Sequence, residues 1–248
     1  MITSAQMRRI EALSEKHGMS KLRLMENAGK AVFSLLDRWF HLSDCYVMIF
    51  CGGGNNGGDG FVAARYLARK TGVTVLLFGD ETKLPPEAAA NLARIQDDNR
   101  IEILRQGDLS EESVIRLAKR ITPNKPILLD AMLGTGVKGQ LRDPIASGIL
   151  LYNRLHGKKV AIDIPSGIDP DTGKAAGMIA ISDKVITFHD TKPGLGRFHD
   201  VIIADIGVPM AAVRESTGRH NRRTGMIPKI NWPWKSVKES RSPKPVKR

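Results

Sequence analysis

The sequence predicts an α/β protein in which a mostly parallel sheet is covered by helices on both faces. Three observations favour this fold class. The 248 residues are enough for one α/β domain. Two amphipathic segments open the chain, and short runs rich in β-branched residues then alternate with helical segments. Such alternation is typical of parallel strands, because a parallel connection must cross back over the sheet.

Two helices are expected before the first strand. Thr3 and Gln6 form a possible capping box, and apolar residues recur at helical spacing after them. The chain breaks at Gly18, after which Ser20 can cap a second helix. The apolar face of this second helix is formed by Leu24, Ala28, Val32 and Leu35. We expect the two helices to cover one edge or one face of the sheet.

Seven apolar runs give the expected strands. They lie within residues 45–51, 73–79, 100–104, 125–136, 158–167, 183–194 and 199–209. Helical segments are expected at 61–72, 85–96 and 110–121, and the second of these begins with prolines, which favour a helix start. The glycine-rich residues 52–60 are expected to form a loop between the first strand and a helix that starts at about Phe61.

Charge divides the chain into two parts. The net charge is +12, but residues 214–248 hold eleven lysines and arginines against two glutamates, so the remainder is nearly balanced. We therefore assign residues 1–212 to one domain and residues 213–248 to a basic, flexible tail. No apolar run has the length of a membrane span, and the first residues do not resemble a targeting peptide. Cys45 and Cys51 are expected to be packed free thiols, which favours a cytoplasmic location.

The glycine-rich stretch "CGGGNNGGDG" has two interpretations. Gly52, Gly54 and Gly57 match the dinucleotide-binding pattern G-x-G-x-x-G, and Asp80 follows at the offset expected for an acid on the ribose. This interpretation predicts a Rossmann-type NAD-dependent dehydrogenase. The stretch is, however, longer than the tight turn of that pattern. The alternative that we favour is a cradle of backbone N–H groups at a helix N-terminus that receives an anion, with Asp59 as a cap or as an acceptor for a ligand hydroxyl.

Two further polar segments also begin where an expected strand ends. They are "LDAMLGTGVKGQ", from Leu129, and "IDIPSGIDP", from Ile162. Ligands of open parallel α/β sheets bind beyond the carboxyl ends of the strands. The three segments are therefore expected to face one crevice.

The motifs together resemble those of a known family. "LMENAG", "GGGNNGGDGFVAARYL", "LLDAMLGTGVKG", "AIDIPSGIDPDTG" and "TKPGLG" are similar in content, order and spacing to the NAD(P)HX epimerase family, whose domain is called the YjeF N-terminal domain. The resemblance covers about residues 2–209. It implies a Rossmann-like three-layer α/β/α sandwich. It also implies an isomerase that interconverts the R and S forms of hydrated NADH or NADPH, so that a separate dehydratase can restore the cofactor.

The resemblance also implies the site residues. Asp163 matches the acid that faces the hydrated nicotinamide and is the expected catalytic residue. The expected substrate-binding residues are Asn55, Asn56, Gly57, Gly58, Asp59, Gly134, Thr135, Gly136, Val137, Lys138, Gly139, Gln140 and Asp163. One potassium ion per subunit is implied, with Asn56, Asp130 and Ser166 as its side-chain ligands. Hard oxygen donors of this kind suit an alkali cation.

The implied chemistry suits a carboxylate. The reacting carbon bears a hydroxyl and the ring nitrogen, so inversion can proceed through loss and re-addition of water or through ring opening. Either route needs a proton donor and acceptor beside the hydroxyl, and Asp163 can serve. As single residues, Asp130 and Asp163 are equally compatible with capping a turn. Lys192 of "TKPG" is a further candidate for the site. "LMENAG" is expected to be mostly helix core, with Glu26 and Asn27 as candidates to line the crevice or to form a dimer contact.

Partners follow from the same comparison. We expect a homodimer, a dehydratase on another chain, and no membrane contact. An alternative of another class is a non-catalytic nucleotide-binding or RNA-associated scaffold, because "NWPWK" in the basic tail can stack bases. The retained loop asparagines, Asp130 and Asp163 argue against a degenerate scaffold.

Overall fold

The computed structural model describes residues 1–136 and 140–217. In these residues the helices are α1 (Ser4–Lys16), α2 (Lys21–Trp39), α3 (Asn55–Leu67), α4 (Pro86–Gln96), α5 (Glu111–Ile121), α6 (Ile145–Arg154) and α7 (Met210–Ser216). The strands are β1 (Tyr46–Gly52), β2 (Gly72–Phe78), β3 (Ile101–Arg105), β4 (Pro126–Ala131), β5 (Lys158–Ile162), β6 (Lys184–Phe188) and β7 (Val201–Ala204). No helix in the described ranges is both long and apolar enough to cross a membrane.

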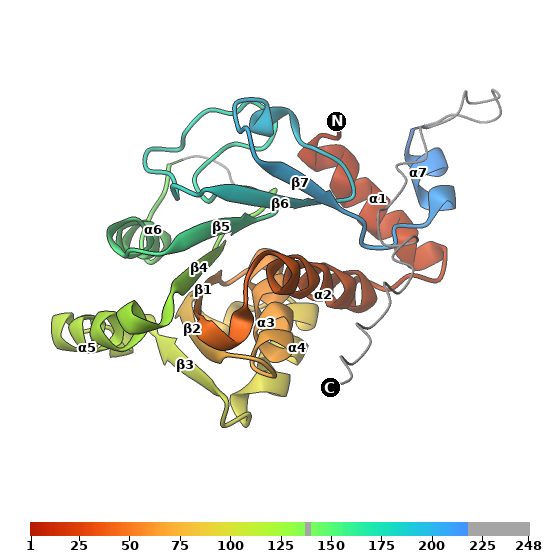
Figure 1. Cartoon of the computed structure of the whole chain (residues 1–248). Coiled ribbons are helices and arrows are strands. Elements are labelled where there is room, and N and C mark those ends of the chain that lie inside the picture. Colours follow the sequence, from red (N-terminus) through yellow and green to blue (C-terminus); the bar gives the residue numbers. More distant parts are fainter. Residues whose placement is uncertain (137–139, 218–248) are drawn as a thin grey trace, which may run out of the picture.

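The described strands form one parallel sheet in the order β3-β2-β1-β4-β5-β6-β7. The predicted fold class is therefore confirmed. The order reverses between β1 and β4, which pair directly (Figure 1). In open sheets of this kind, the carboxyl ends of the strands at such a reversal form the usual ligand crevice.

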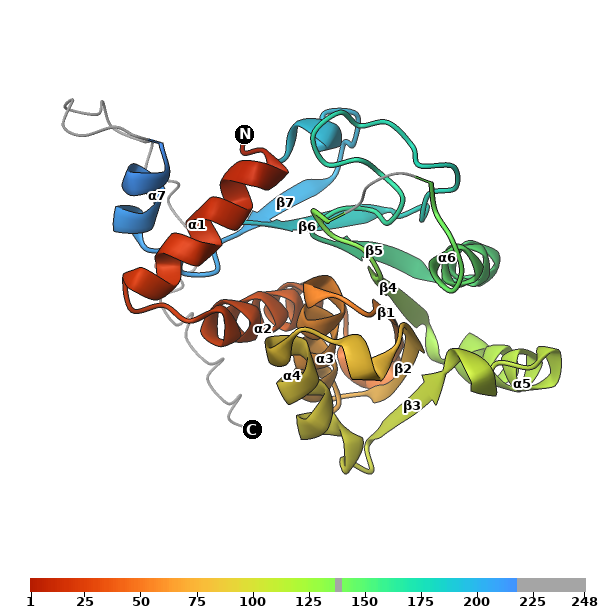
Figure 2. The same cartoon turned by 180° about the vertical axis from the view of Figure 1, so that it is seen from behind.

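Helices cover both faces of the sheet (Figures 1 and 2). Alternate residues of β1 face opposite sides, because side chains of a strand alternate. Val47 and Ile49 belong to the core that α1 to α4 share with the sheet, whereas Met48 and Phe50 belong to the core with α5 and α6. The three-layer arrangement thus follows from strands that are apolar on both faces.

The two N-terminal helices begin as predicted. The Thr3 side chain accepts a hydrogen bond from the Gln6 backbone and the Gln6 side chain accepts one from the Thr3 backbone, which completes the capping box. Ser20 caps α2 through the Arg23 backbone N–H. On α2 the fully buried residue of the last turns is Leu36; Leu35 is only partly buried.

α1 is fixed to distant parts of the chain. The Asp171 carboxylate accepts hydrogen bonds from the Ser4 backbone N–H at 2.7 Å and the Ser4 hydroxyl at 2.6 Å. At the other end of α1, Glu215 of α7 pairs with Lys16 and His17. The helix is therefore held at both ends by residues from the C-terminal third of the chain.

One predicted boundary was wrong: the helix expected from Phe61 begins at Asn55, so the asparagines and glycines form its first turns. Residue 213, where the tail was expected to begin, lies within α7, which runs to Ser216 and is joined to α1 through Glu215. The division of the chain at this residue stays a prediction. The rest of the tail, residues 218–248, lies outside the described residues.

The glycines of α3 explain the early start of the helix. A Cβ at Gly57 would lie 2.0 Å from the carbonyl oxygen of Gly52, and one at Gly60 would lie 2.7 Å from Cys51 Sγ. A side chain at Gly58 would lie 2.6 Å from Met25 of α2. Glycine thus lets the first turns of α3 pack directly against β1 and α2.

Candidate functional site

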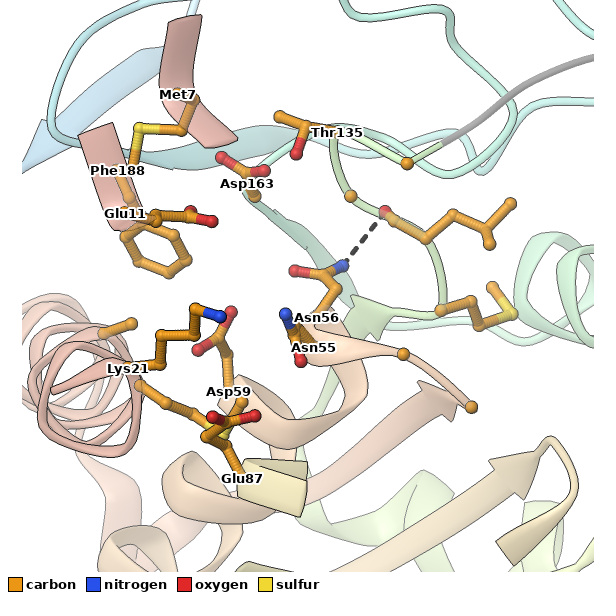
Figure 3. Close-up of a pocket in the computed structure, with 18 of the residues that line it drawn as sticks. Met7, Glu11, Lys21, Asn55, Asn56, Asp59, Glu87, Thr135, Asp163 and Phe188 are labelled. Atoms are coloured by element: carbon orange, nitrogen blue, oxygen red, sulfur yellow. Dashed lines mark hydrogen bonds between the residues drawn. The ribbon is translucent and has the colours of Figure 1, made fainter. Parts of the chain in front are cut away.

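A cavity of about 590 Å³ lies at the carboxyl ends of β1, β4 and β5. Its walls come from the start of α3, the segment after β4, the end of β5, and helices α1 and α2 (Figure 3). Of the expected site residues, Asn55, Asn56, Asp59, Gly134, Thr135, Gly136 and Asp163 line it. The crevice that three separate motifs predicted is therefore present.

Of the other expected substrate-binding residues, three are described and are not among the residues that line the cavity, and three lie outside the described residues. Gly57 and Gly58 face the interior, where they allow close packing, and they are not among the residues that line the cavity. Gln140 is exposed and does not line the cavity either. Val137, Lys138 and Gly139 lie outside the described residues.

Asp163 follows β5 directly and has a left-handed backbone conformation, with φ = 67°. Residues other than glycine rarely adopt this conformation, and it costs about 1–3 kcal/mol where the surroundings enforce it. Here the Asp163 N–H donates to the Ile186 carbonyl at 2.7 Å, which fixes the turn. The carboxylate is thereby aimed into the cavity beside Thr135 and Asn56 (Figure 3).

Lys192 is the charge partner of Asp163. Its ammonium lies 2.6 Å from Asp163 Oδ1, and it also donates to the Thr187 hydroxyl at 2.8 Å and to the Phe188 carbonyl at 3.0 Å. The lysine is 1% exposed. Sequence reasoning ranked Lys192 as a lesser candidate, because a single lysine carries no sign of burial; its structural position makes it the group that holds Asp163.

The side-chain amide of Asn56 has hydrogen-bond partners for its nitrogen but not, among the described residues, for its oxygen. Its amide nitrogen donates to the carbonyls of Leu133 and Ile162, at 3.0 and 3.2 Å. Its amide oxygen is buried and has no hydrogen-bond partner among the described residues. A buried oxygen without a partner destabilises the folded protein unless a ligand donates a hydrogen bond to it or an ion binds it.

Asp130 and Ser166 are fully buried and are not among the residues that line the cavity. The Asp130 carboxylate accepts hydrogen bonds from the Ser166 hydroxyl at 2.6 Å, the Ser166 N–H at 2.7 Å and the Met132 N–H at 3.2 Å. Burial raises the pKa of Asp130 to about 6, because the charged form loses its hydration. The Ser166 hydroxyl also accepts from the Leu133 N–H, so it connects the segments after β4 and β5.

Four charged residues of the cavity wall were not predicted as site residues. They are Arg8 and Glu11 of α1, Lys21 of α2 and Glu87 of α4. Glu11 is the most perturbed of them: burial, and then the nearby Asp163, raise its pKa to about 7. Burial and the same neighbours also raise the pKa of Asp59 well above its usual range. Nothing in the local sequence distinguishes Glu11 from the exposed Glu15 one turn later.

Asp80 does not take part in this site. Its carboxylate accepts from Thr82 and pairs with Lys83, and it is not among the lining residues. The glycine pattern that suggested a ribose acid at this position is instead explained by close packing. A Cβ at Gly52 would lie 2.0 Å from the Met132 carbonyl oxygen.

Fold and site define a Rossmann-like α/β protein with a cavity at the topological switch point and a buried carboxylate in its wall. Comparison with known proteins gives the family. Residues 21–194 match the family described as YjeF-related protein N-terminus. The chain belongs to this family.

Two relatives and one solved structure illustrate the match. The NAD(P)H-hydrate epimerase of Cenarchaeum symbiosum is 36% identical over 217 residues, which are 85% of this chain and 97% of the relative. The bifunctional NAD(P)H-hydrate repair enzyme Nnr of Archaeoglobus fulgidus is 38% identical over 84% of this chain. The chain spans 42% of the length of that bifunctional relative. The crystal structure of yeast ynu0 has the same fold, with a TM-score of 0.65, 22% identity, and coverage of 82% of this chain and 86% of the yeast chain.

Proposed function

We propose that this protein is an NAD(P)H-hydrate epimerase, which interconverts the R and S forms of hydrated NADH and NADPH. The observation that carries the proposal is the Asp163 carboxylate, held by Lys192 and aimed into the cavity. The proposal is supported by the name NAD(P)H-hydrate epimerase of a relative that this chain matches over 97% of the relative's length.

The geometry suits the reaction. The carbon to be inverted bears a hydroxyl group, and a carboxylate beside it can accept or return a proton. Lys192 keeps Asp163 paired within a wall that is otherwise shielded from water, so the carboxylate is positioned before the substrate arrives. Asn55, Gly53 and Gly54 at the start of α3 offer backbone N–H groups and a helix N-terminus to a phosphate of the dinucleotide.

We further propose that one potassium ion binds near Asn56, Asp130 and Ser166. The residues fit such an ion because their donors are all oxygens, and because Asn56 Oδ1 is buried and unpartnered within the described residues. A cation here would supply positive charge beside the buried Asp130 carboxylate and would order the segments after β1, β4 and β5.

Three broader expectations belong to the same proposal. A dehydratase on another chain would consume the S form, as the bifunctional names of the longer relatives suggest. A cytoplasmic location and a homodimer stay predictions from the sequence. Any role of the basic tail in nucleic-acid binding concerns residues outside the described part of the chain.

The test is a coupled assay. A mixture of R and S NADHX is treated with an S-specific dehydratase, which alone consumes the S form quickly and leaves the R form behind. Addition of this protein should remove the lag. Asp163→Asn should lower the rate at least about 100-fold while dinucleotide binding is retained. Glu112→Gln, an exposed change on α5, is the matched control. An unchanged lag with wild-type protein would contradict the proposal.

A further inference from the structure

We propose that Glu11 of α1 is a second catalytic residue, which gives a proton to the leaving hydroxyl of the substrate from the α1 wall of the cavity. The inference rests on the proposed epimerase function. Its starting point is chemical: inversion through loss and re-addition of water needs a proton donor for the leaving hydroxyl and a proton acceptor for the water that returns. Asp163, which is paired with the Lys192 ammonium, supplies the acceptor and leaves the donor unassigned.

Glu11 lies where the second group is needed. Its carboxyl group points into the same space as the carboxyl group of Asp163 and the amide of Asn56, but it comes from α1 rather than from the sheet (Figure 3). Within the described residues, Glu11 makes no hydrogen bond or ion pair, in contrast to Asp163 with Lys192. A carboxyl group without a structural partner is available to a ligand.

The surroundings of Glu11 favour its protonated form. Met7, one turn earlier on α1, and Phe188 line the cavity beside it and limit its hydration (Figure 3). The charged groups near it are Asp163 and Asp59, which disfavour the anion, and Lys192, Lys21 and Arg8, which favour it. Burial is the largest influence, and the pKa of Glu11 is about 7.

The second observation that points to a ligand is independent of the acids. Asn56 is 7% exposed, lines the same cavity, and presents an unpartnered oxygen among the described residues. The space between Glu11, Asp163 and Asn56 is thus bordered by polar groups that protein contacts leave incomplete. A hydroxylated ring with a carboxamide can hydrogen-bond to Glu11 and Asp163, next to the Asn56 oxygen that is assigned above to the potassium ion.

The step balances without any further reactant. Protonated Glu11 gives its proton to the substrate hydroxyl, the C–O bond breaks with its electron pair on oxygen, and water leaves. The lone pair of the ring nitrogen forms a C=N⁺ bond to the same carbon. Water then adds to the opposite face of that carbon and gives a proton to Asp163, which restores a neutral substrate of inverted configuration. Asp163 then releases its proton to water and Glu11 takes one up from water, which returns the enzyme to its starting state. The reverse reaction uses the two carboxyl groups in exchanged roles.

The experiment measures the pH profile of kcat/KM for wild type, Glu11→Gln, Glu11→Asp and the control Glu15→Gln, with the R form as substrate. Glu15 is exposed on the same helix and does not line the cavity. Wild type should lose activity with rising pH near 7, as Glu11 loses its proton. The kcat/KM of Glu11→Gln should be at least 100-fold lower at pH 7 and should no longer decrease as pH rises through 7. Glu11→Asp should keep part of the wild-type kcat/KM. Glu15→Gln should match wild type at every pH.

The outcomes separate the two proposals. An inactive wild type contradicts the epimerase function and this inference with it. An active wild type together with a Glu11→Gln rate within threefold of it overturns the inference alone. A Glu11→Gln protein whose kcat/KM is lower at every pH but still decreases as pH rises through 7 also overturns the inference. Glu11 would then support the site without transferring the proton.

Discussion

The ammonium of Lys192 lies 2.6 Å from Asp163 Oδ1, and the lysine is almost completely buried. Asp163 directly follows β5, and Lys192 lies in the segment after β6. Removal of either partner leaves the other charged group in the interior without compensation, which is far more costly than the loss of an exposed ion pair. The pair therefore links the stability of the protein to the integrity of its site.

Asp163→Asn and Lys192→Met should each destabilise the protein by about 3–5 kcal/mol, because each leaves a buried charge unpaired. The double variant should cost less than the sum of the two, since it removes both charges. Urea denaturation of wild type, the two single variants and the double variant gives the free energies of unfolding from which the coupling between the two residues is calculated. Purely additive effects would show that the two residues do not form a pair in solution. The folded double variant also serves as an inactive control for the epimerase assay.

Glu11 should make the stability of the protein dependent on pH. Its pKa rises from 4.5 to about 7 on folding, so the folded protein binds more protons than the unfolded chain between these values. Stability should therefore fall as pH rises from 4.5 to 7 and stay low above it. Glu11→Gln lacks this penalty, and its gain over wild type should be greater at pH 8 than at pH 4.5.

The size of this gain has an upper bound of about 3 kcal/mol, reduced because the side chain is partly exposed. Thermal or urea unfolding at the two pH values measures it, with Glu15→Gln as control. An equal difference at both pH values would mean that Glu11 titrates as it does in water.

Substitution of alanine for the glycines at the start of α3 should lower the stability of the protein by very different amounts. Gly57→Ala places a methyl group 2.0 Å from the backbone oxygen of Gly52, and strand β1 cannot yield without disturbing the sheet. We expect a loss of about 3 kcal/mol or more. Gly54→Ala is the matched control, because nothing lies within 4 Å of its added carbon and its φ of −122° suits any residue. Its cost should stay below about 1 kcal/mol. Similar losses for both would show that α3 does not pack on β1 in this way.

Potassium should stabilise the protein through Asn56. Addition of KCl should raise the unfolding temperature more than choline chloride at the same ionic strength, because an ion that binds only the folded state stabilises it. Asn56→Ala removes the unpartnered oxygen and should abolish the specific part of the shift. Differential scanning fluorimetry gives the readout without any activity. An equal specific shift in wild type and variant would place the ion elsewhere or exclude it.

Most of the fold could be predicted because its signals are local. Capping residues such as Thr3 and Ser20 and the seven apolar runs each carry their own information. α6 was missed, since its Gly148 interrupts a helical pattern that only the packing against Met132 and Phe78 explains. The start of α3 was misplaced for the same reason: glycine is a poor helix former unless close packing requires it.

The site was predictable only where it follows strands. Asp163 and Asn56 stand directly after or near apolar runs, and the carboxyl ends of parallel strands meet at one edge. Glu11 and Lys192 carry no such mark, because their role depends on burial. That burial arises when α1 and the segment after β6 are brought to the same cavity. Local sequence patterns could not predict these contacts between distant segments, and therefore could not predict the burial of Glu11 and Lys192.

The anchoring of α1 has a consequence for the newly made chain. Ser4 finds Asp171 only 167 residues later, and Lys16 finds Glu215 only 199 residues later. The ribosome therefore releases α1 long before the groups that hold it exist, while the sheet from β1 onward can already begin to form. An unfinished chain can thus have much of its sheet but lacks the wall that carries Glu11. On the proposed mechanism, catalysis begins only after Glu215 has been added to the chain.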